Sequence, residues 1–253
     1  RPSFSLYEHY ANVLEARVVG VPVDLHSGAL PVDLLIEAAR ESDGRVVIIV
    51  CSPNNPTGSV LREGELEELL STGAAVILDR AYAEFAGTKF PPIGDRLIVL
   101  STLSKAFGLA GLRIGWLAAA PSTAKEIRKV KLPYNLNIAS EEIAFEALQQ
   151  RDKLLSIIET IIRERDRIAS RMRQRDLEVF PSAANFLLFR VNDARAVFDG
   201  LLENDVLVRN VSTAPGLENC LRVSVGTRKD NDRFLRVLES LTDDRPMAAG
   251  VTA

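Results

Sequence analysis

The sequence predicts an α/β fold: a large domain built on a mostly parallel sheet, followed by a smaller α+β domain. Three observations favour it. Short, nearly continuous apolar segments alternate with helical patterns through the first half. Polar motifs follow several of these segments, and the pattern changes to long helical stretches beyond about residue 122. A chain of 253 residues is long enough for both domains.

The first half supplies the elements of the expected parallel sheet. Strands are predicted, from their runs of Val, Ile, Leu and Ala, over residues 16–23, 45–51, 74–79, 96–102 and 113–119. Helices are predicted over residues 31–41 and 64–71. Continuous apolar strands separated by helices are typical of a sheet buried on both faces, so we expect burial on both sides here.

The second half predicts helices first and a small mixed unit afterwards. Residues 133–135 (Pro-Tyr-Asn) break one helix. Ser140, followed by two glutamates, is expected to cap the N-terminus of a long helical stretch that reaches about residue 175 with one interruption. A strand at 185–191, a helix at 194–203, strands at 206–209 and 220–225 and a helix at 229–241 complete the chain.

These elements predict four regions. Residues 1–135 form the large α/β domain, 136–175 a connecting long helix, and 176–242 the small C-terminal α+β domain. Residues 243–253 have few apolar side chains to bury, so a flexible tail is expected there.

Composition excludes several classes of protein. No apolar run approaches the roughly 20 residues that span a bilayer, and a net charge of −3 gives no basic surface for nucleic acid. The two histidines, His9 and His26, lack the spacing of a metal site, so no metal is predicted. Cys51 and Cys220 lie in separate apolar segments, as expected of small buried side chains in a reducing compartment.

The polar motifs follow predicted strands. Ligands of open α/β sheets bind at the carboxyl ends of the strands, so these motifs are expected to converge. They are Cys-Ser-Pro-Asn-Asn-Pro-Thr-Gly at 51–58, Asp-Arg-Ala-Tyr at 79–82 and Ser-Thr-Leu-Ser-Lys-Ala-Phe-Gly-Leu-Ala-Gly-Leu-Arg-Ile-Gly at 101–115.

Taken in this order, the motifs resemble those of the class I and II aminotransferases. Ser-Lys-Ala-Phe followed by Ala-Gly-Leu-Arg is most similar to the histidinol-phosphate aminotransferase group, and residues 181–186 and 221–227 support that subgroup. The resemblance extends from residue 2 to about residue 241. It implies the fold of PLP-dependent transferases (fold type I), with a seven-strand type of large domain that lacks its N-terminal pieces, pyridoxal 5′-phosphate (PLP) as cofactor, and a cytoplasmic homodimer.

The resemblance also implies a role for each matching residue. PLP withdraws electrons from the substrate when its ring nitrogen is protonated. Asp79 matches the residue that holds this proton, and Lys105 matches the lysine that binds the cofactor as a Schiff base and then transfers protons. The remaining matches are Asn55 and Tyr82 for the phenolic oxygen, Thr102, Ser104 and Arg113 for the phosphate, and Phe4 for stacking on the ring.

The substrate residues are expected on the second domain. Arg222 matches the residue that binds the α-carboxylate, and an arginine inside an apolar strand is costly to bury without an anion. Arg209 is a second candidate, for a substrate phosphate, and Tyr7, Asn185 and Tyr134 are expected to line the site. The implied reaction is ping-pong amino transfer between histidinol phosphate and 2-oxoglutarate; aromatic or other amino acids are the alternative substrates.

Two departures from the family leave an alternative open. Arg80 stands where the subgroup commonly has an acidic residue, and its side chain is expected to point away from the cofactor. The family's N-terminal portion, with its phosphate-binding turn and a tyrosine that reaches the neighbouring subunit, has no counterpart here. The chain is therefore expected to be a fragment of a longer product, or a truncated, non-catalytic homologue that serves as a binding or structural module.

Two other enzyme classes are excluded. A Ser-x-x-Lys acyl-transfer enzyme would need serine where Thr102 stands. A dinucleotide-binding enzyme would need Gly-x-Gly-x-x-Gly after a first strand, and no such motif occurs.

Overall fold

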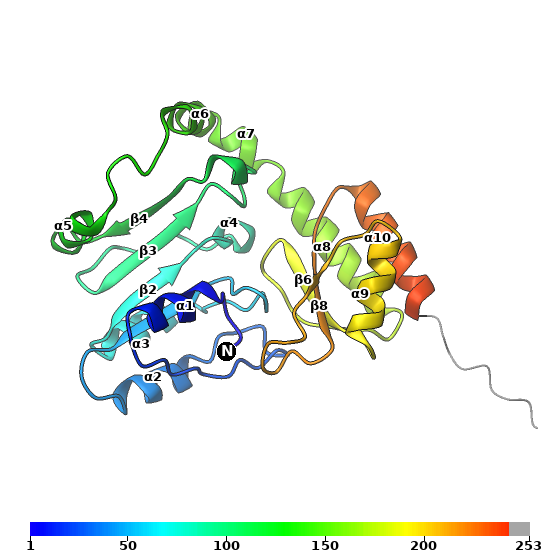
Figure 1. The fold of residues 1–253 in the computed structure, drawn as a ribbon, viewed down its shortest axis with the longest axis horizontal. Helices are drawn as coiled ribbons and strands as arrows, with labels where there is room; N and C mark the ends of the chain where they lie inside the picture. The colour runs from blue at the N-terminus through cyan, green and yellow to red at the C-terminus, as the bar shows by residue number, and fades with distance from the viewer. Residues whose placement is uncertain (243–253) are drawn as a thin grey trace, which may run out of the picture.

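The computed structural model describes residues 1–242, so the predicted flexible tail lies outside the described residues. Its first sheet has the strand order β1-β2-β3-β4 (Figure 1). These strands are Val47–Cys51, Ala75–Asp79, Leu97–Thr102 and Gly115–Ala119. The first three are parallel and β4 is antiparallel to β3, so the predicted mostly parallel sheet is confirmed. The described part of this sheet has four strands where the resemblance implied a seven-strand type.

Helices α2 (Val32–Arg40) and α3 (Glu65–Ser71) cover one face of this sheet. Alternate strand residues point toward them and form a core with Leu30, Val32, Ile48, Val50, Leu69, Ala74, Val76, Leu78, Leu97 and Val99. The side chains between these on β1 point the opposite way, and Val47 is 54% exposed. Burial on both faces was therefore a wrong prediction for β1, because both helices that flank it in sequence pack on the same side.

The predicted strand at residues 16–23 is also wrong. This segment runs without regular structure from α1 (Leu6–Val13), a helix that the sequence analysis missed, toward α2. The Val23 amide donates to the Arg1 carbonyl, but no described strand lies alongside to form a ladder. Apolar residues make a strand only where a neighbouring backbone can accept and donate its hydrogen bonds.

The helical stretch after the first sheet differs from the prediction at its start and in its breaks. The helices are α5 (Pro121–Val130), α6 (Ile138–Gln149), α7 (Arg151–Leu155) and α8 (Ile158–Arg173). The stretch predicted to reach about residue 175 contains α6, α7 and α8, so it breaks twice, not once. Asn137, not Ser140, caps α6: its side chain accepts a hydrogen bond of 2.8 Å from the Ser140 amide. Asparagine is as strong a cap as serine, and Asn137 comes first in the chain.

The second sheet is antiparallel throughout, with the order β5-β6-β8-β7. Its strands are Glu178–Val179, Phe186–Arg190, Cys220–Ser224 and Arg209–Asn210 for β5, β6, β8 and β7. Helices α8, α9 (Ala194–Glu203) and α10 (Arg228–Thr242) pack with it around one apolar core. The strand predicted at 206–209 begins only at Arg209, which makes that prediction wrong for most of its length. Two short helical segments, α4 (Ala83–Ala86) and η1 (Ala110–Leu112), were not predicted.

Glu164 of α8, whose side chain is largely buried, joins that helix to α10 through an ionic network. Its carboxylate accepts hydrogen bonds from Arg167, from Arg228 and from the amide of Asn231, at 2.7 to 3.0 Å. Arg167, with further hydrogen bonds from Asn231 and Arg228, lowers the pKa of Glu164 to about 2. The ionised form is thus the one that the fold stabilises.

This network predicts a loss of stability in acid. A carboxylate whose pKa is lowered by folding contributes its stability above its ordinary pKa of 4.5, and that contribution is lost as the pH falls toward about 2. We expect Glu164→Gln to remove on the order of 2 kcal/mol at neutral pH, a figure reduced for screening at the exposed Arg228, and to flatten the acid limb. Chemical denaturation between pH 2 and 7 measures both; a parent and variant with parallel acid limbs would contradict the assignment.

Among residues 1–242, no helix combines the length and the apolar character that crossing a membrane requires.

Candidate functional site

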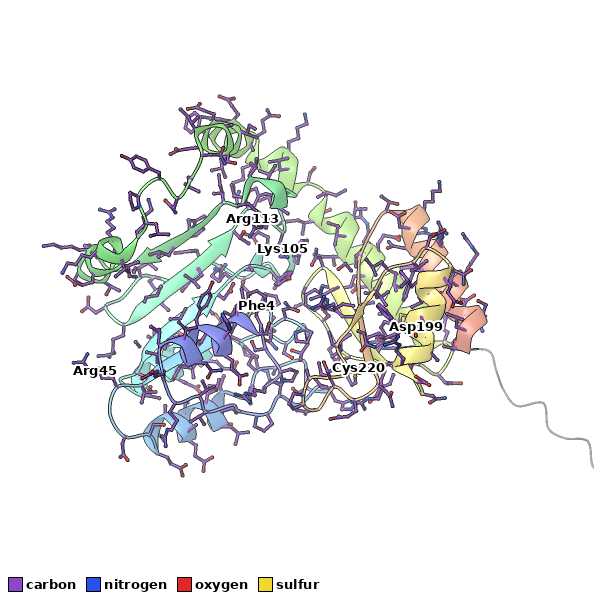
Figure 2. The ribbon with its side chains drawn as sticks, in the orientation of Figure 1. Phe4, Arg45, Lys105, Arg113, Asp199 and Cys220 are labelled. Carbon is purple, nitrogen blue, oxygen red and sulfur yellow. The ribbon has the colours of Figure 1, made fainter. Side chains whose placement is uncertain are left out.

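The predicted site residues come mainly from the carboxyl ends of the parallel strands and from the second sheet. Cys51 ends β1 directly beside Asp79 at the end of β2, and Lys105 follows β3. Arg222 comes from β8 of the other sheet. Figure 2 shows Phe4, Lys105 and Arg113 where the first sheet faces the second. Parallel strands carry the motifs to one edge, as the sequence predicts.

Arg222 connects the two sheets at this edge. Its Nη1 donates a 2.6 Å hydrogen bond to Oδ1 of Asn55, and its guanidinium carbon lies 5.0 Å from the ring centre of Phe186. Its Nε is buried and has no hydrogen-bond partner among the described residues. Burial lowers the pKa of Arg222, as does the charge of Arg209. A half-buried guanidinium whose buried Nε has no acceptor favours an anionic ligand.

Lys105 lies against the ring of Tyr82, with Nζ 5.4 Å from the ring centre. Partial burial lowers the pKa of Lys105, and the positive charges of Arg222 and Arg113 lower it further, while Asp79 opposes them. Tyr82 is itself buried, which raises the pKa of its phenol. A lowered pKa increases the fraction of neutral amine, the form that attacks a carbonyl carbon.

Asp79 is held by two donors from the chain. Its Oδ2 accepts a 2.5 Å hydrogen bond from the Tyr7 hydroxyl, and its Oδ1 accepts one of 2.9 Å from the Ala81 amide. Burial raises the pKa of Tyr7, and the neighbouring Asp79 carboxylate adds to that effect. Tyr7, predicted as a substrate contact, is thus placed against the carboxylate expected to contact the cofactor.

The loop after β3 gathers the hydroxyls predicted for the phosphate. The Thr102 hydroxyl lies 2.9 Å from that of Ser104 and 3.2 Å from the Ile114 carbonyl, and it accepts from the Ser104 amide. Arg113 is exposed, adopts a left-handed conformation (φ 57°), and donates to the Ala110 carbonyl. Its charge acts on Lys105, as noted above, so it belongs to the same cluster.

The N-terminal segment is fastened to this cluster by Asn54, a residue that the sequence analysis did not assign. Its amide donates to the Pro2 carbonyl at 2.9 Å, and its oxygen accepts from the Ser3 hydroxyl at 2.6 Å. Phe4 follows with 38% of its surface exposed and its ring edge-on to that of Tyr7. Asn54 is 1% exposed, and a polar side chain next to Asn55 in the motif was the available signal.

Four other predicted positions lie at the margin of the cluster or away from it. Arg209 is exposed on β7 and pairs in register with Arg222. Asn185 is half-buried, and its carbonyl accepts from the Val225 amide. Tyr134 is 98% exposed between α5 and α6, and the structure does not bring it to the other residues. Arg80 donates to the carbonyls of residues 88 and 89, away from the cluster.

The comparisons identify the family. The model for aminotransferase class I and II matches residues 1–238. The chain belongs to this family. Histidinol-phosphate aminotransferases of Roseiflexus castenholzii and Chlorobaculum tepidum are 39% and 41% identical to it over 95% of its length. The chain spans 66% and 70% of the length of these two relatives.

The fold comparison agrees with the sequence comparison. The crystal structure of histidinol-phosphate aminotransferase from Sinorhizobium meliloti in complex with pyridoxal-5′-phosphate superposes with a TM-score of 0.85 at 25% identity. The match covers 95% of this chain and 68% of that one. Family membership thereby confirms the predicted transferase fold and PLP as the cofactor of the class.

The site of this aminotransferase-family chain depends on a close approach between its two sheets. Gly58 has φ 77°, and a Cβ there would come within 2.3 Å of the Ser182 hydroxyl oxygen. The Ala183 amide donates to the Gly58 carbonyl across the same contact. Only glycine fits a left-handed position this close to another backbone, which explains its place at the end of the 51–58 motif.

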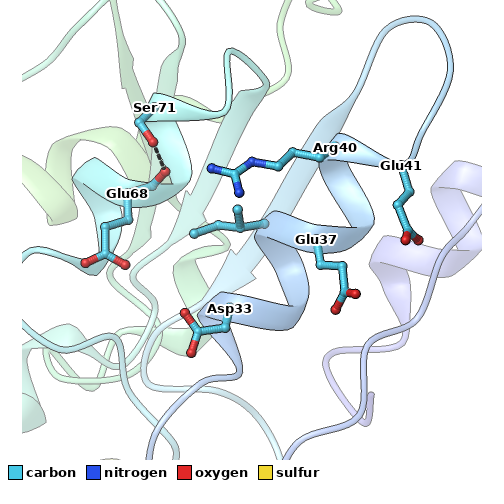
Figure 3. A pocket seen from close by; sticks show the side chains of 7 residues that line it. Asp33, Glu37, Arg40, Glu41, Glu68 and Ser71 are labelled. Atoms are coloured by element: carbon cyan, nitrogen blue, oxygen red, sulfur yellow. Dashed lines mark hydrogen bonds between the residues drawn. The ribbon is translucent and has the colours of Figure 1, made fainter.

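A hollow elsewhere on the aminotransferase-family chain lies apart from this cluster. Figure 3 shows a hollow between α2 and α3 lined by Asp33, Ile36, Glu37, Arg40, Glu41, Glu68 and Ser71. It contains none of the predicted site residues. Within residues 1–242, no group of three or more His, Cys, Asp or Glu side chains is arranged to hold a metal ion.

Proposed function

We propose that this chain carries out PLP-dependent amino transfer between histidinol phosphate and 2-oxoglutarate. The observation that supports it most is the unpartnered, buried Nε of Arg222, in a site where the charge of Arg222 lowers the pKa of Lys105 and that of Asp79 opposes it. An amine, a carboxylate and a buried cation are the groups needed for cofactor attachment, ring protonation and carboxylate binding.

The donors present fit the cofactor. PLP, when bound, supplies the electron sink for removal of the substrate Cα proton. Thr102, Ser104 and Arg113 would hold its phosphate, Asp79 would face its ring nitrogen, and Tyr82 and Asn55 its phenolic oxygen. Because Oδ1 of Asn55 already accepts from Arg222, its amide nitrogen is left to donate.

Lys105 is assigned two tasks in turn. Its neutral amine would hold the cofactor, and the same amine would move a proton at the substrate Cα. The partial burial that lowers its pKa suits both tasks, because an ammonium group can neither attack a carbonyl nor accept a proton. The ring of Tyr82 lies below the amine, with its centre 5.4 Å from Nζ.

The substrate assignment rests on the anion-binding residues and on the relatives. Arg222 would bind the α-carboxylate of the amino-acid donor, and Arg209, exposed beside it, would meet a more distant phosphate. The relatives at 39% and 41% identity are histidinol-phosphate aminotransferases. We also propose that the protein is a homodimer in the cytoplasm. The domain boundaries at residues 135, 175 and 242 are part of the same proposal.

A spectroscopic titration tests the function. PLP is added to the purified chain, the visible absorption is recorded, and glutamate is then titrated in. We expect a yellow band that glutamate bleaches and 2-oxoglutarate restores. Histidinol phosphate should bleach it at lower concentrations than phenylalanine does; the reverse order would favour the aromatic alternative. Protein that gives no band with PLP would contradict the proposal and favour a non-catalytic homologue.

A further inference from the structure

Tyr7 occupies a position that no substrate-binding role explains. It lies on α1, and its hydroxyl donates to Oδ2 of Asp79 at 2.5 Å. The Cys51 thiol lies beside both groups, but it donates to the Pro53 carbonyl and, because burial raises its pKa to about 12, it stays a neutral thiol. Tyr7 is therefore the side chain that supplies Asp79 with a hydroxyl donor.

Contacts made by the residues before and after Tyr7 in the chain orient its hydroxyl toward Asp79. Asn54 fastens residues 2 and 3 to the loop after β1, and Arg1 forms a 2.8 Å ion pair with Glu8. Phe4 packs edge-on against the Tyr7 ring at 5.5 Å between centres. The phenol is thus held from its own helix and from the motif loop, which leaves little freedom for its oxygen.

We propose that Tyr7 is a positioning residue for Asp79, one that orients the carboxylate toward the cofactor's ring nitrogen and does not bind substrate. The inference rests on the proposed function. With Tyr7 on Oδ2 and the Ala81 amide on Oδ1, the carboxylate plane is set by two donors, and each oxygen keeps a lone pair for another. The terminal torsion of aspartate is otherwise broad, so a single donor would leave the plane free to turn.

Orientation of this kind affects cofactor affinity. A carboxylate already oriented loses no rotational freedom when the cofactor binds, and its lone pair points where the ring nitrogen arrives. Removal of one charge-assisted hydrogen bond should therefore weaken PLP binding by about tenfold or more. The effect should depend on the carboxylate and vanish when the carboxylate is absent.

The experiment is a double-mutant cycle in PLP affinity, read by absorption and fluorescence titration of the 253-residue chain. Tyr7→Phe removes only the hydroxyl, Asp79→Asn removes the charge and replaces one acceptor oxygen by an amide donor, and the double variant completes the cycle. Tyr10→Phe is the matched control, because Tyr10 lies on the same helix and is 60% exposed. We expect Tyr7→Phe to weaken PLP binding about tenfold in the parent, but less than about twofold in the Asp79→Asn background.

Each outcome separates the inference from the function. Equal effects of Tyr7→Phe in both backgrounds would show a merely structural tyrosine and overturn the inference, while the function would stand. Unchanged affinity in Tyr7→Phe would do the same. Weaker binding of substrate with unchanged PLP affinity in Tyr7→Phe would return Tyr7 to a substrate role. A parent chain that binds no PLP would overturn the proposed function and this inference together.

Discussion

Replacement of Lys105 by alanine is expected to abolish amino transfer while the fold stays intact. Proton transfer by a positioned side chain contributes about 10²–10⁴-fold in rate, and the variant also loses the amine that attaches the cofactor. The Lys105 side chain is exposed and is not part of the hydrophobic cores, so the melting temperature of the variant should change little.

The measurement is turnover together with the visible spectrum and thermal unfolding. Lys125→Ala is the matched control, since Lys125 is an exposed lysine on α5, outside every motif. The control should transaminate and bind PLP as the parent does. A Lys105→Ala protein with parental turnover would show that the lysine is misassigned.

The second large effect is expected for Asp79→Ala. Without the carboxylate, the ring nitrogen of bound PLP should lose its proton more readily; a change of two pKa units corresponds to about 2.7 kcal/mol, or roughly a hundredfold in rate. PLP should still attach to Lys105, so the yellow band should remain. The Tyr7 hydroxyl would lose its acceptor, which adds a cost to stability.

Two variants separate charge from shape in this prediction. Asp79→Asn keeps the size of the side chain and should lose turnover nearly as much as Asp79→Ala. Asp152→Ala, at a side chain that is 97% exposed on α7, should behave as the parent. Rates are compared at saturating PLP, so weaker binding cannot account for the loss. Asp79→Asn with parental turnover would refute the proposed role of the charge.

The sequence predicted some strands of this fold correctly and others wrongly, and the difference has a physical reason. Strands β1, β2 and β3 were predicted within two residues because each is a short apolar run bounded by polar or glycine residues. Residues 16–23 are also mostly apolar, yet they form no strand, because a strand also needs a neighbouring backbone. The exposure of Val47 could not be predicted either, because a sequence shows that a strand is apolar but not which of its faces a helix will cover.

The residues of the site show the same difference between what local sequence predicts and what packing decides. The sequence by itself determined the family and the cofactor, and it is the source of the proposed roles of Lys105 and Asp79, because the motifs are local and specific in residue type and order. Only the tertiary structure decided that Tyr7 contacts Asp79, that Arg222 reaches Asn55, and that Tyr134 stays in solvent. These contacts join residues 72 and 167 positions apart, and such distances are set by the packing of helices and sheets, which no local pattern encodes.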